Sequence, residues 1–209
     1  MTFGILVCGD SISLGRGESP NIGWVGRLKN YIEPQGFNNC VFNLGVPGDT
    51  STCLLERFET EVKSRVRYIH RVDKFVIMIA IGTNDSKAIR LPDKIKTSPA
   101  EFKRNINKLI RIARKYTKNV IVVGLTPVDE NKTNPLEDRY LINDRIVQYD
   151  EILKTSTKVN KTYFIDIHRS FIKLEYRKLL IDGLHPNKRG YDEMYRIIKY
   201  FLVKKKLIA

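Results

Sequence analysis

Cysteine, histidine and long apolar runs are all scarce in this sequence of 209 residues. The longest apolar runs, Phe75 to Gly82 and Val120 to Leu125, are far shorter than the roughly 20 residues that a membrane-spanning helix needs. The N-terminal segment lacks the basic start of a signal peptide and runs from a short apolar stretch directly into a Gly-Asp turn. We therefore expect no integral membrane association and a cytoplasmic location.

The shortage of cysteine and of nucleotide-binding motifs excludes several kinds of site. Cys8, Cys40 and Cys53 cannot all pair with one another, and their spacing is not that of metal ligands. This usage is typical of buried thiols in a reducing compartment. The sequence has neither a Walker loop nor a G-x-G-x-x-G pattern. We expect no metal and no cofactor.

Acidic residues are outnumbered, since 37 lysines and arginines against 23 aspartates and glutamates give a net charge of +14. A strongly basic chain attracts nucleic acid or anionic membranes where its charges cluster. Here the positive charges are spread along most of the chain, and the signatures of helix-turn-helix, zinc-finger and RNP domains are missing. We expect a solvated basic surface and no nucleic-acid partner, and the sequence predicts no particular oligomeric state.

The composition is that of a globular chain, with 42% hydrophobic and 29% charged residues. No repeat or low-complexity linker divides it, so we expect one domain over residues 1–209. Continuous apolar character, typical of parallel strands covered on both faces, marks five predicted strands: Phe3 to Gly9, Val41 to Leu44, Phe75 to Ile81, Val120 to Leu125 and Tyr163 to Ile167.

Amphipathic segments of helical spacing lie between or after these strands. Three are clear: Leu54 to Val62, Phe102 to Ala113 and Tyr191 to Phe201. Suitable helix starts precede them: Asp49 or Thr50, Ser98-Pro99 and Asn187. The alternation predicts an α/β fold, a three-layer α/β/α sandwich around a five-stranded, mainly parallel sheet. One long irregular stretch, Thr126 to about Glu137, follows a strand, where open sheets bind ligands.

The segment from Gly9 to Gly15, with the sequence GDSISLG, directly follows the first predicted strand. A serine flanked by glycines at such a point is presented at the carboxyl edge of the sheet, with its backbone N–H free to face a ligand. Ser11 is therefore a candidate nucleophile. The alternative is an ordinary turn in which Asp10 and Ser11 bond the nearby backbone.

A second motif, DGLHP, runs from Asp182 to Pro186 before the last predicted helix. A carboxylate three residues before a histidine can accept from the imidazole Nδ1–H, which leaves Nε2 free to take a proton from a hydroxyl. The alternative is a local turn with a surface histidine. Two other histidines compete as bases: His70, in a basic run without an aligned carboxylate, and His168, which follows Asp166 at a strand end.

Two further strand ends carry groups that can stabilise a developing negative charge. Asn84, in IGTND, follows the third strand, so its amide falls on the same edge of the sheet as Ser11. Gly45, in NLGVPG, follows the second strand, and its N–H can approach the same point without a side chain in the way. Each also fits ordinary turn chemistry, but the four motifs together supply a nucleophile, a base, its orienting carboxylate and oxyanion donors.

In combination and in order, these motifs resemble those of the GDSL or SGNH hydrolase family, over nearly the whole chain. Ser11 looks like the nucleophile of that family, Gly45 and Asn84 like its oxyanion residues, and Asp182 with His185 like its carboxylate-histidine pair. The resemblance implies a flavodoxin-like sheet and favours His185 over His168 as the base. It also implies that the Asp10 and Asp85 carboxylates support loops. Ile12, where the family name implies leucine, and Pro47 are the departures from its pattern.

The expected activity is hydrolysis of a small-molecule ester, with a short acyl chain, through an acyl-enzyme on Ser11 without a metal. Thioesterase, lysophospholipase and carbohydrate deacetylase activities stay open, because the resemblance does not separate them. So does transfer of the acyl group to an alcohol. A different class of function, a non-catalytic module whose basic face docks nucleic acid or membrane, accounts for the charge but leaves the four motifs unexplained.

Overall fold

The computed structural model describes residues 1–65, 67 and 71–209. Its elements begin with β1 (Phe3–Gly9), α1 (Ser11–Leu14), α2 (Gly23–Ile32), a 3₁₀ turn (Glu33–Gln35), β2 (Cys40–Gly45), α3 (Ser51–Lys63), β3 (Lys74–Ala80), β4 (Ala88–Ile89) and α5 (Pro99–Ala113). They continue with β5 (Val120–Val123), α6 (Glu130–Thr133), β6 (Arg139–Tyr140), α7 (Asn143–Val159), β7 (Tyr163–Ile165), α8 (Ile167–Ile172), a second 3₁₀ turn (Tyr176–Leu179) and α9 (Lys188–Lys204). The candidate base His70 lies outside the described residues.

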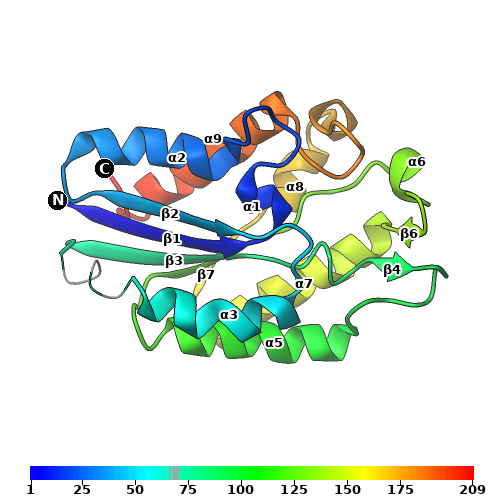
Figure 1. The fold of residues 1–209 in the computed structure, drawn as a ribbon, viewed down its shortest axis with the longest axis horizontal. Helices are drawn as coiled ribbons and strands as arrows, with labels where there is room; N and C mark the ends of the chain where they lie inside the picture. Colours follow the sequence, from blue (N-terminus) through cyan, green and yellow to red (C-terminus); the bar gives the residue numbers. More distant parts are fainter. Residues whose placement is uncertain (66, 68–70) are drawn as a thin grey trace.

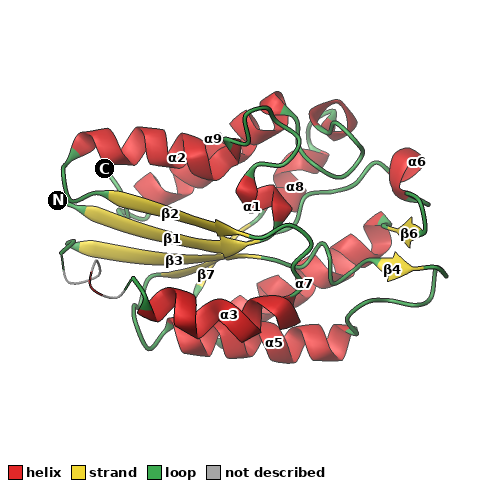
Figure 2. Ribbon diagram, in the orientation of Figure 1, coloured by secondary structure: helices red, strands yellow, loops and turns green. Residues whose placement is uncertain are grey.

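A parallel sheet of five strands, in the order β2-β1-β3-β5-β7, forms the middle layer (Figure 2). All five predicted strands are present, each within two residues of the expected bounds. Helices α2, α8 and α9 cover one face, and α3, α5 and α7 cover the other (Figure 1). The predicted three-layer α/β fold is confirmed.

Alternating side chains of the inner strands feed two separate cores. In β1, Ile5 and Val7 pack toward α2 and α9, whereas Leu6 and Cys8 pack toward α3 and α5. Successive residues of a strand point to opposite faces. Both faces of this sheet are dry, which is why its strands are apolar without alternation.

The helix starts follow the predicted capping chemistry. Thr50 accepts from the backbone N–H of Cys53, Ser98 accepts from that of Glu101, and Asn187 accepts from that of Gly190. Each cap satisfies an N–H that has no partner within its own helix.

Among the described residues, five helices lie outside the three helical segments that the sequence predicted: α1, α2, α6, α7 and α8. Helix α7 buries Asp150, Ser156 and Thr157 beside apolar residues, so its buried face is not marked by hydropathy. Helix α2 follows a loop rich in Gly, Ser and Pro that carries no capping side chain. The stretch from Thr126 to Glu137 is not wholly irregular, because α6 forms inside it.

The strand order places a topological switch between β1 and β3, since the chain leaves β1 toward β2 and then returns to the other side. Ligands of open parallel sheets bind outside the carboxyl ends of the strands at such a switch. Within the described residues, none of the helices has both the length and the apolar composition needed to cross a bilayer.

Candidate active site

Ser11 is the first residue of α1, directly beyond the carboxyl end of β1. The Asp10 side chain caps this short helix by accepting from the Ile12 N–H at 2.9 Å. Gly9 permits the tight packing behind it, because a Cβ there would lie 2.2 Å from Ser13 Oγ and 2.5 Å from the Ala80 carbonyl. The nucleophile candidate is therefore held by its backbone rather than by its own side chain.

The hydroxyl of Ser11 lies 3.0 Å from His185 Nε2, and both residues are largely buried. On the other side of the ring, His185 Nδ1 lies 2.7 Å from Asp182 Oδ2. A proton on Nδ1 satisfies the carboxylate and leaves the Nε2 lone pair facing the serine hydroxyl. The three side chains form one chain of hydrogen bonds.

The Asp182 carboxylate is held from its own loop as well. Oδ1 accepts from the backbone N–H groups of Leu184 at 2.9 Å and His185 at 2.7 Å. Burial works to raise the pKa of Asp182, but the bonds from the His185 ring and from these two amides outweigh it and leave the pKa well below its usual range. The group thus stays ionised beside the imidazole.

Two glycines with positive φ, Gly183 and Gly17, allow the histidine loop to pack closely against its neighbours. Gly183 has φ +88°, and a Cβ there would lie 2.7 Å from the Cβ of Lys132 in α6. A Cβ on Gly17, with φ +102°, would lie 3.0 Å from the Cβ of His185. The stretch after β5 also reaches this loop, since the Asp129 N–H donates to the Gly183 carbonyl at 2.8 Å. In the sequence, the only sign of this packing is the presence of glycine at positions 17 and 183.

Asn84 lies at the carboxyl end of β3 and turns toward the same point. Its Nδ2 donates to the Asp49 carbonyl at 3.0 Å and makes a long contact of 3.4 Å with Asp10 Oδ2. Its Oδ1 accepts from Lys87 Nζ at 3.2 Å. The amide is thus oriented from both ends.

Gly45 does not offer the amide that the sequence analysis expected of it. Its N–H donates to Asn43 Oδ1 at 3.1 Å, and a Cβ on Gly45 would lie 2.5 Å from the Leu14 backbone nitrogen. Gly45 ends β2 and packs against α1, whereas the loop that turns over the site comes after it. Gly48, in that loop, lines the cavity with Ser11 and His185, and its N–H has no acceptor within the described residues. We therefore propose Gly48 in place of Gly45 as the candidate donor.

Two buried carboxylates lie behind the site. Burial raises the pKa of Asp10 to about 7, against the opposing bond from Ile12. Asp85 accepts from the Ser51 N–H at 2.9 Å and from the Ser51 hydroxyl at 2.7 Å, which anchors the start of α3, and burial raises its pKa too. Both carboxylates accept from backbone N–H groups at the start of a helix, Asp10 in α1 and Asp85 in α3.

His168 is not part of this arrangement. It lies in α8, does not line the cavity with Ser11, and burial lowers its pKa. Its Nε2 is buried without a partner in the described part of the chain. The structure brings His185, and not His168, to Ser11.

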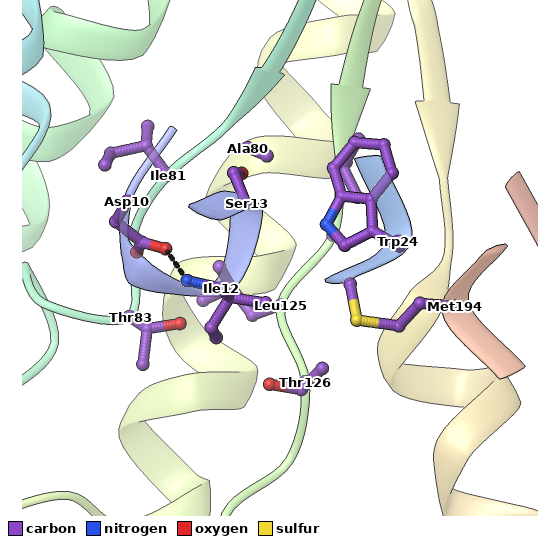
Figure 3. A pocket seen from close by; sticks show the side chains of 12 residues that line it. Asp10, Ile12, Ser13, Trp24, Ala80, Ile81, Thr83, Leu125, Thr126 and Met194 are labelled. Atoms are coloured by element: carbon purple, nitrogen blue, oxygen red, sulfur yellow. Dashed lines mark hydrogen bonds between the residues drawn. The ribbon is translucent and has the colours of Figure 1, made fainter. Parts of the chain in front are cut away.

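Two cavities adjoin α1. An open cavity of about 440 Å³ contains Ser11, Asn84, Asp182 and His185. A much smaller one of about 20 Å³ lies on the other side of α1, among Ser13, Trp24 and Thr126 (Figure 3). That volume accommodates a single water molecule and no substrate. Of these two cavities, the open one is lined by Ser11 and can present its hydroxyl to a ligand.

The model of the GDSL-like lipase/acylhydrolase family matches residues 7–193. An acetylxylan esterase of Xylanibacter ruminicola is 28% identical over 143 residues, covering 59% of this chain and 27% of that protein. Esterase TesA of Pseudomonas aeruginosa is 26% identical over 121 residues, covering 58% of this chain and 53% of that protein. The chain thus spans between about a quarter and about half of the length of these two curated relatives.

Among solved structures, a lipase/acylhydrolase from Enterococcus faecalis superposes with a TM-score of 0.75 at 23% identity, covering 97% of this chain and 96% of that one. At this level of identity the likeness shows a shared fold. The loops that carry Ser11, Asn84 and His185 all lie within the residues that the family model matches.

Proposed function

The chain belongs to the GDSL-like lipase/acylhydrolase family, and from that premise we propose that it hydrolyses carboxylic esters through an acyl-enzyme on Ser11. The observation that carries the proposal is the continuous hydrogen-bonded chain from Ser11 through His185 to Asp182, at 3.0 and 2.7 Å. A nucleophile, a base and an orienting carboxylate in this relation are the requirement for acyl transfer to serine.

In the proposed reaction, His185 Nε2 takes the Ser11 proton as the hydroxyl oxygen attacks the ester carbonyl. Asp182 stabilises the imidazolium that forms. His185 then protonates the leaving alcohol, and water, activated by the same imidazole, attacks the acyl-enzyme to release the acid. The first proton transfer, from Ser11 Oγ to His185 Nε2, joins two atoms that lie 3.0 Å apart.

The negative charge of the tetrahedral intermediate needs preorganised donors. The N–H groups of Ser11 and Gly48 have no acceptor among the described residues, and both residues line the cavity. The Asn84 amide is the third proposed donor. Its long contact with Asp10 Oδ2, at 3.4 Å, is the one that an oxyanion can replace most readily.

We propose a short acyl group such as acetyl for the substrate. The apolar lining of the cavity is limited to a few side chains, Pro47, Leu136 and Leu184, beside several charged residues. This surface fits a small acyl group better than a long lipid chain. The two curated relatives, one named an acetylxylan esterase and one an esterase, are consistent with this class.

A cytoplasmic location is part of the proposal. Its support is three free cysteines, of which Cys8 is buried and Cys40 and Cys53 are half-buried. Free thiols of this kind are typical of a reducing compartment.

The test is a series of p-nitrophenyl esters of increasing acyl length, assayed beside an acyl-CoA and an acetylated sugar. We expect the highest kcat/KM for the shortest acyl esters and loss of turnover in Ser11→Ala. A serine-directed organophosphate should label the wild-type protein and not Ser11→Ala. Undiminished turnover by a folded Ser11→Ala protein would contradict the mechanism. Salt-sensitive binding to DNA or anionic vesicles without labelling would favour the non-catalytic module.

A further inference from the structure

The cavity that holds Ser11 and His185 is also lined by three cationic side chains from separate parts of the chain. Arg16 follows α1, Lys87 precedes β4, and Arg139 lies in β6. Strands β4 and β6 pair with each other beyond the carboxyl ends of the central sheet (Figure 1). The three positive charges therefore line the candidate active-site cavity itself.

The carboxylates that line the same cavity are already engaged. Asp182 bonds to the His185 ring and to two backbone amides. Glu137 forms an ion pair with Arg139. In the part of the chain that the structure describes, no carboxylate lies within ion-pair distance of Lys87 or Arg16. Two of the three cations thus face the cavity without a balancing anion.

Of the three, Lys87 is the one bonded to Asn84, a candidate oxyanion residue. Its side chain is half-buried, and its ammonium donates to Asn84 Oδ1 at 3.2 Å. Burial lowers the pKa of Lys87, and repulsion by Lys96 and Arg139 lowers it further, with Asp10 and Asp138 opposing from beyond ion-pair distance. A partly desolvated ammonium with only a neutral acceptor costs free energy that an anionic partner would recover.

We propose that this cavity takes esters that carry a carboxylate or phosphate close to the scissile bond, with Lys87 as the main contact of that anion and Arg16 and Arg139 flanking it. The inference rests on the proposed function, since it assigns the charge of the substrate of the same site. Lys87 would then have two roles, because the ammonium that binds the anion of the substrate also donates to Asn84 Oδ1 and orients that amide.

The experiment uses matched pairs of esters that differ in one negative charge. On the alcohol side the pair is 4-acetoxybenzoate and methyl 4-acetoxybenzoate. On the acyl side the pair is ethyl hydrogen succinate and ethyl methyl succinate. Hydrolysis of the ethyl ester is measured by the release of ethanol. For each pair, the measured ratio is kcat/KM for the anionic ester divided by kcat/KM for the neutral ester. This ratio is then compared between wild type and variants. The intrinsic reactivities of the two esters cancel in this comparison.

We expect Lys87→Gln to lower this ratio about tenfold or more in at least one pair, because charge-assisted hydrogen bonds are the strong ones. Lys87→Arg should restore most of the ratio. Arg139→Gln, which does not contact Asn84, should lower the ratio about threefold. The wild-type ratio should also fall with added salt, because screening weakens attraction between partly exposed charges.

Arg111→Gln is the matched control for net charge. Arg111 is exposed near the C-terminal end of α5, which runs back toward the amino edge of the sheet, and its loss should leave the ratio unchanged. If Lys87 acts only by orienting Asn84, Lys87→Gln lowers kcat/KM for neutral and anionic esters alike. An unchanged ratio in both pairs for Lys87→Gln and Arg139→Gln overturns the inference.

A phosphate pair tells the two kinds of anion apart. In the esters 4-acetoxyphenyl phosphate and 4-acetoxyphenyl dimethyl phosphate, the phosphate takes the place of the carboxylate of 4-acetoxybenzoate, at a similar distance from the scissile bond. A Lys87-dependent preference in the succinate or benzoate pair alone assigns a carboxylate near the ester, and a preference in all pairs extends the inference to phosphate. Turnover of neutral esters that survives Ser11→Ala contradicts the proposed function instead, so the two failures are distinguishable.

Discussion

The hydroxyl of Ser11 and the Nε2 atom of His185 lie 3.0 Å apart although 174 residues separate them in the chain. One side chain is placed by the short helix after β1, the other by the loop before α9. Tyr191 of α9 joins these two regions, because its hydroxyl donates to the Arg16 carbonyl at 2.5 Å. The contact thus depends on packing between the first and last parts of the fold.

The carboxylate of the proposed triad gives the first prediction. Asp182→Asn keeps an oxygen that can accept from the Leu184 and His185 amides, but it removes the charge that stabilises the imidazolium. We expect kcat to fall on the order of 10²- to 10⁴-fold, with little change in KM. Because the pKa of Asp182 is well below its usual range, its protonation should not set the acidic limb of the wild-type pH profile. A variant with wild-type kcat would contradict the role of Asp182.

Gly45, at the end of β2, and Gly48, in the loop after it, should respond differently to alanine. At Gly45 a Cβ would lie 2.5 Å from the Leu14 nitrogen and 2.6 Å from the Asp10 carbonyl, so Gly45→Ala must displace α1 and should lower both stability and kcat. At Gly48 a Cβ meets nothing within 4 Å, but φ is +83°.

The backbone strain at Gly48 is about 1–2 kcal/mol for an L-residue. Gly48→Ala should therefore cost about that much stability while kcat falls further than the stability loss explains, because the amide moves. Urea unfolding and steady-state kinetics on both variants measure this split. Equal losses of stability and of kcat in Gly45→Ala and Gly48→Ala would contradict the different roles of these two glycines.

The Asp85 carboxylate should matter more for stability than for turnover. It is fully buried and accepts from both the N–H and the hydroxyl of Ser51. Asp85→Ala leaves these donors without an acceptor, and we expect the free energy of unfolding to drop by roughly 2–4 kcal/mol. Asp93→Ala, at an exposed aspartate, is the control and should be within about 0.5 kcal/mol of wild type. A double-mutant cycle with Ser51→Ala isolates the pair.

The buried carboxyl group of Asp150 should make the stability of the protein depend on pH. Burial raises its pKa from 3.8 to about 7, against the opposing bond from the Leu125 N–H. Between these two values the folded protein holds a proton that the unfolded chain has released, so the contribution of Asp150 to stability falls as the pH rises from about 4 to about 7 and is level above that.

The variant Asp150→Asn removes this titration. The difference in free energy of unfolding, variant minus wild type, should increase by on the order of 1–3 kcal/mol from pH 4 to pH 8. Chemical denaturation at the two pH values measures the change, with Asp144→Asn, at an exposed position of the same helix, as the control. A difference between variant and wild type that does not vary with pH would show that Asp150 titrates normally.

Some features could be read from short stretches of sequence because their causes are local. The strands are apolar throughout because both faces are covered, and Thr50, Ser98 and Asn187 are caps because of their position relative to the next three residues. Helix α7 could not be found in this way, since its buried face carries Asp150 and Ser156, whose side chains accept from the tertiary neighbours Leu125 and Asn107 that no local pattern reveals.

The sequence by itself determined the α/β alternation and the strand-end positions of Ser11 and Asn84, because a parallel sheet brings the carboxyl ends of its strands to one edge. Residue spacing left His185 and His168 open, and the family resemblance favoured His185; only the tertiary structure showed that His185 meets Ser11 and that Gly48 lines the cavity. Those choices depend on how the loops after β2 and before α9 pack against α1. Residue spacing along the chain carries no information about that packing.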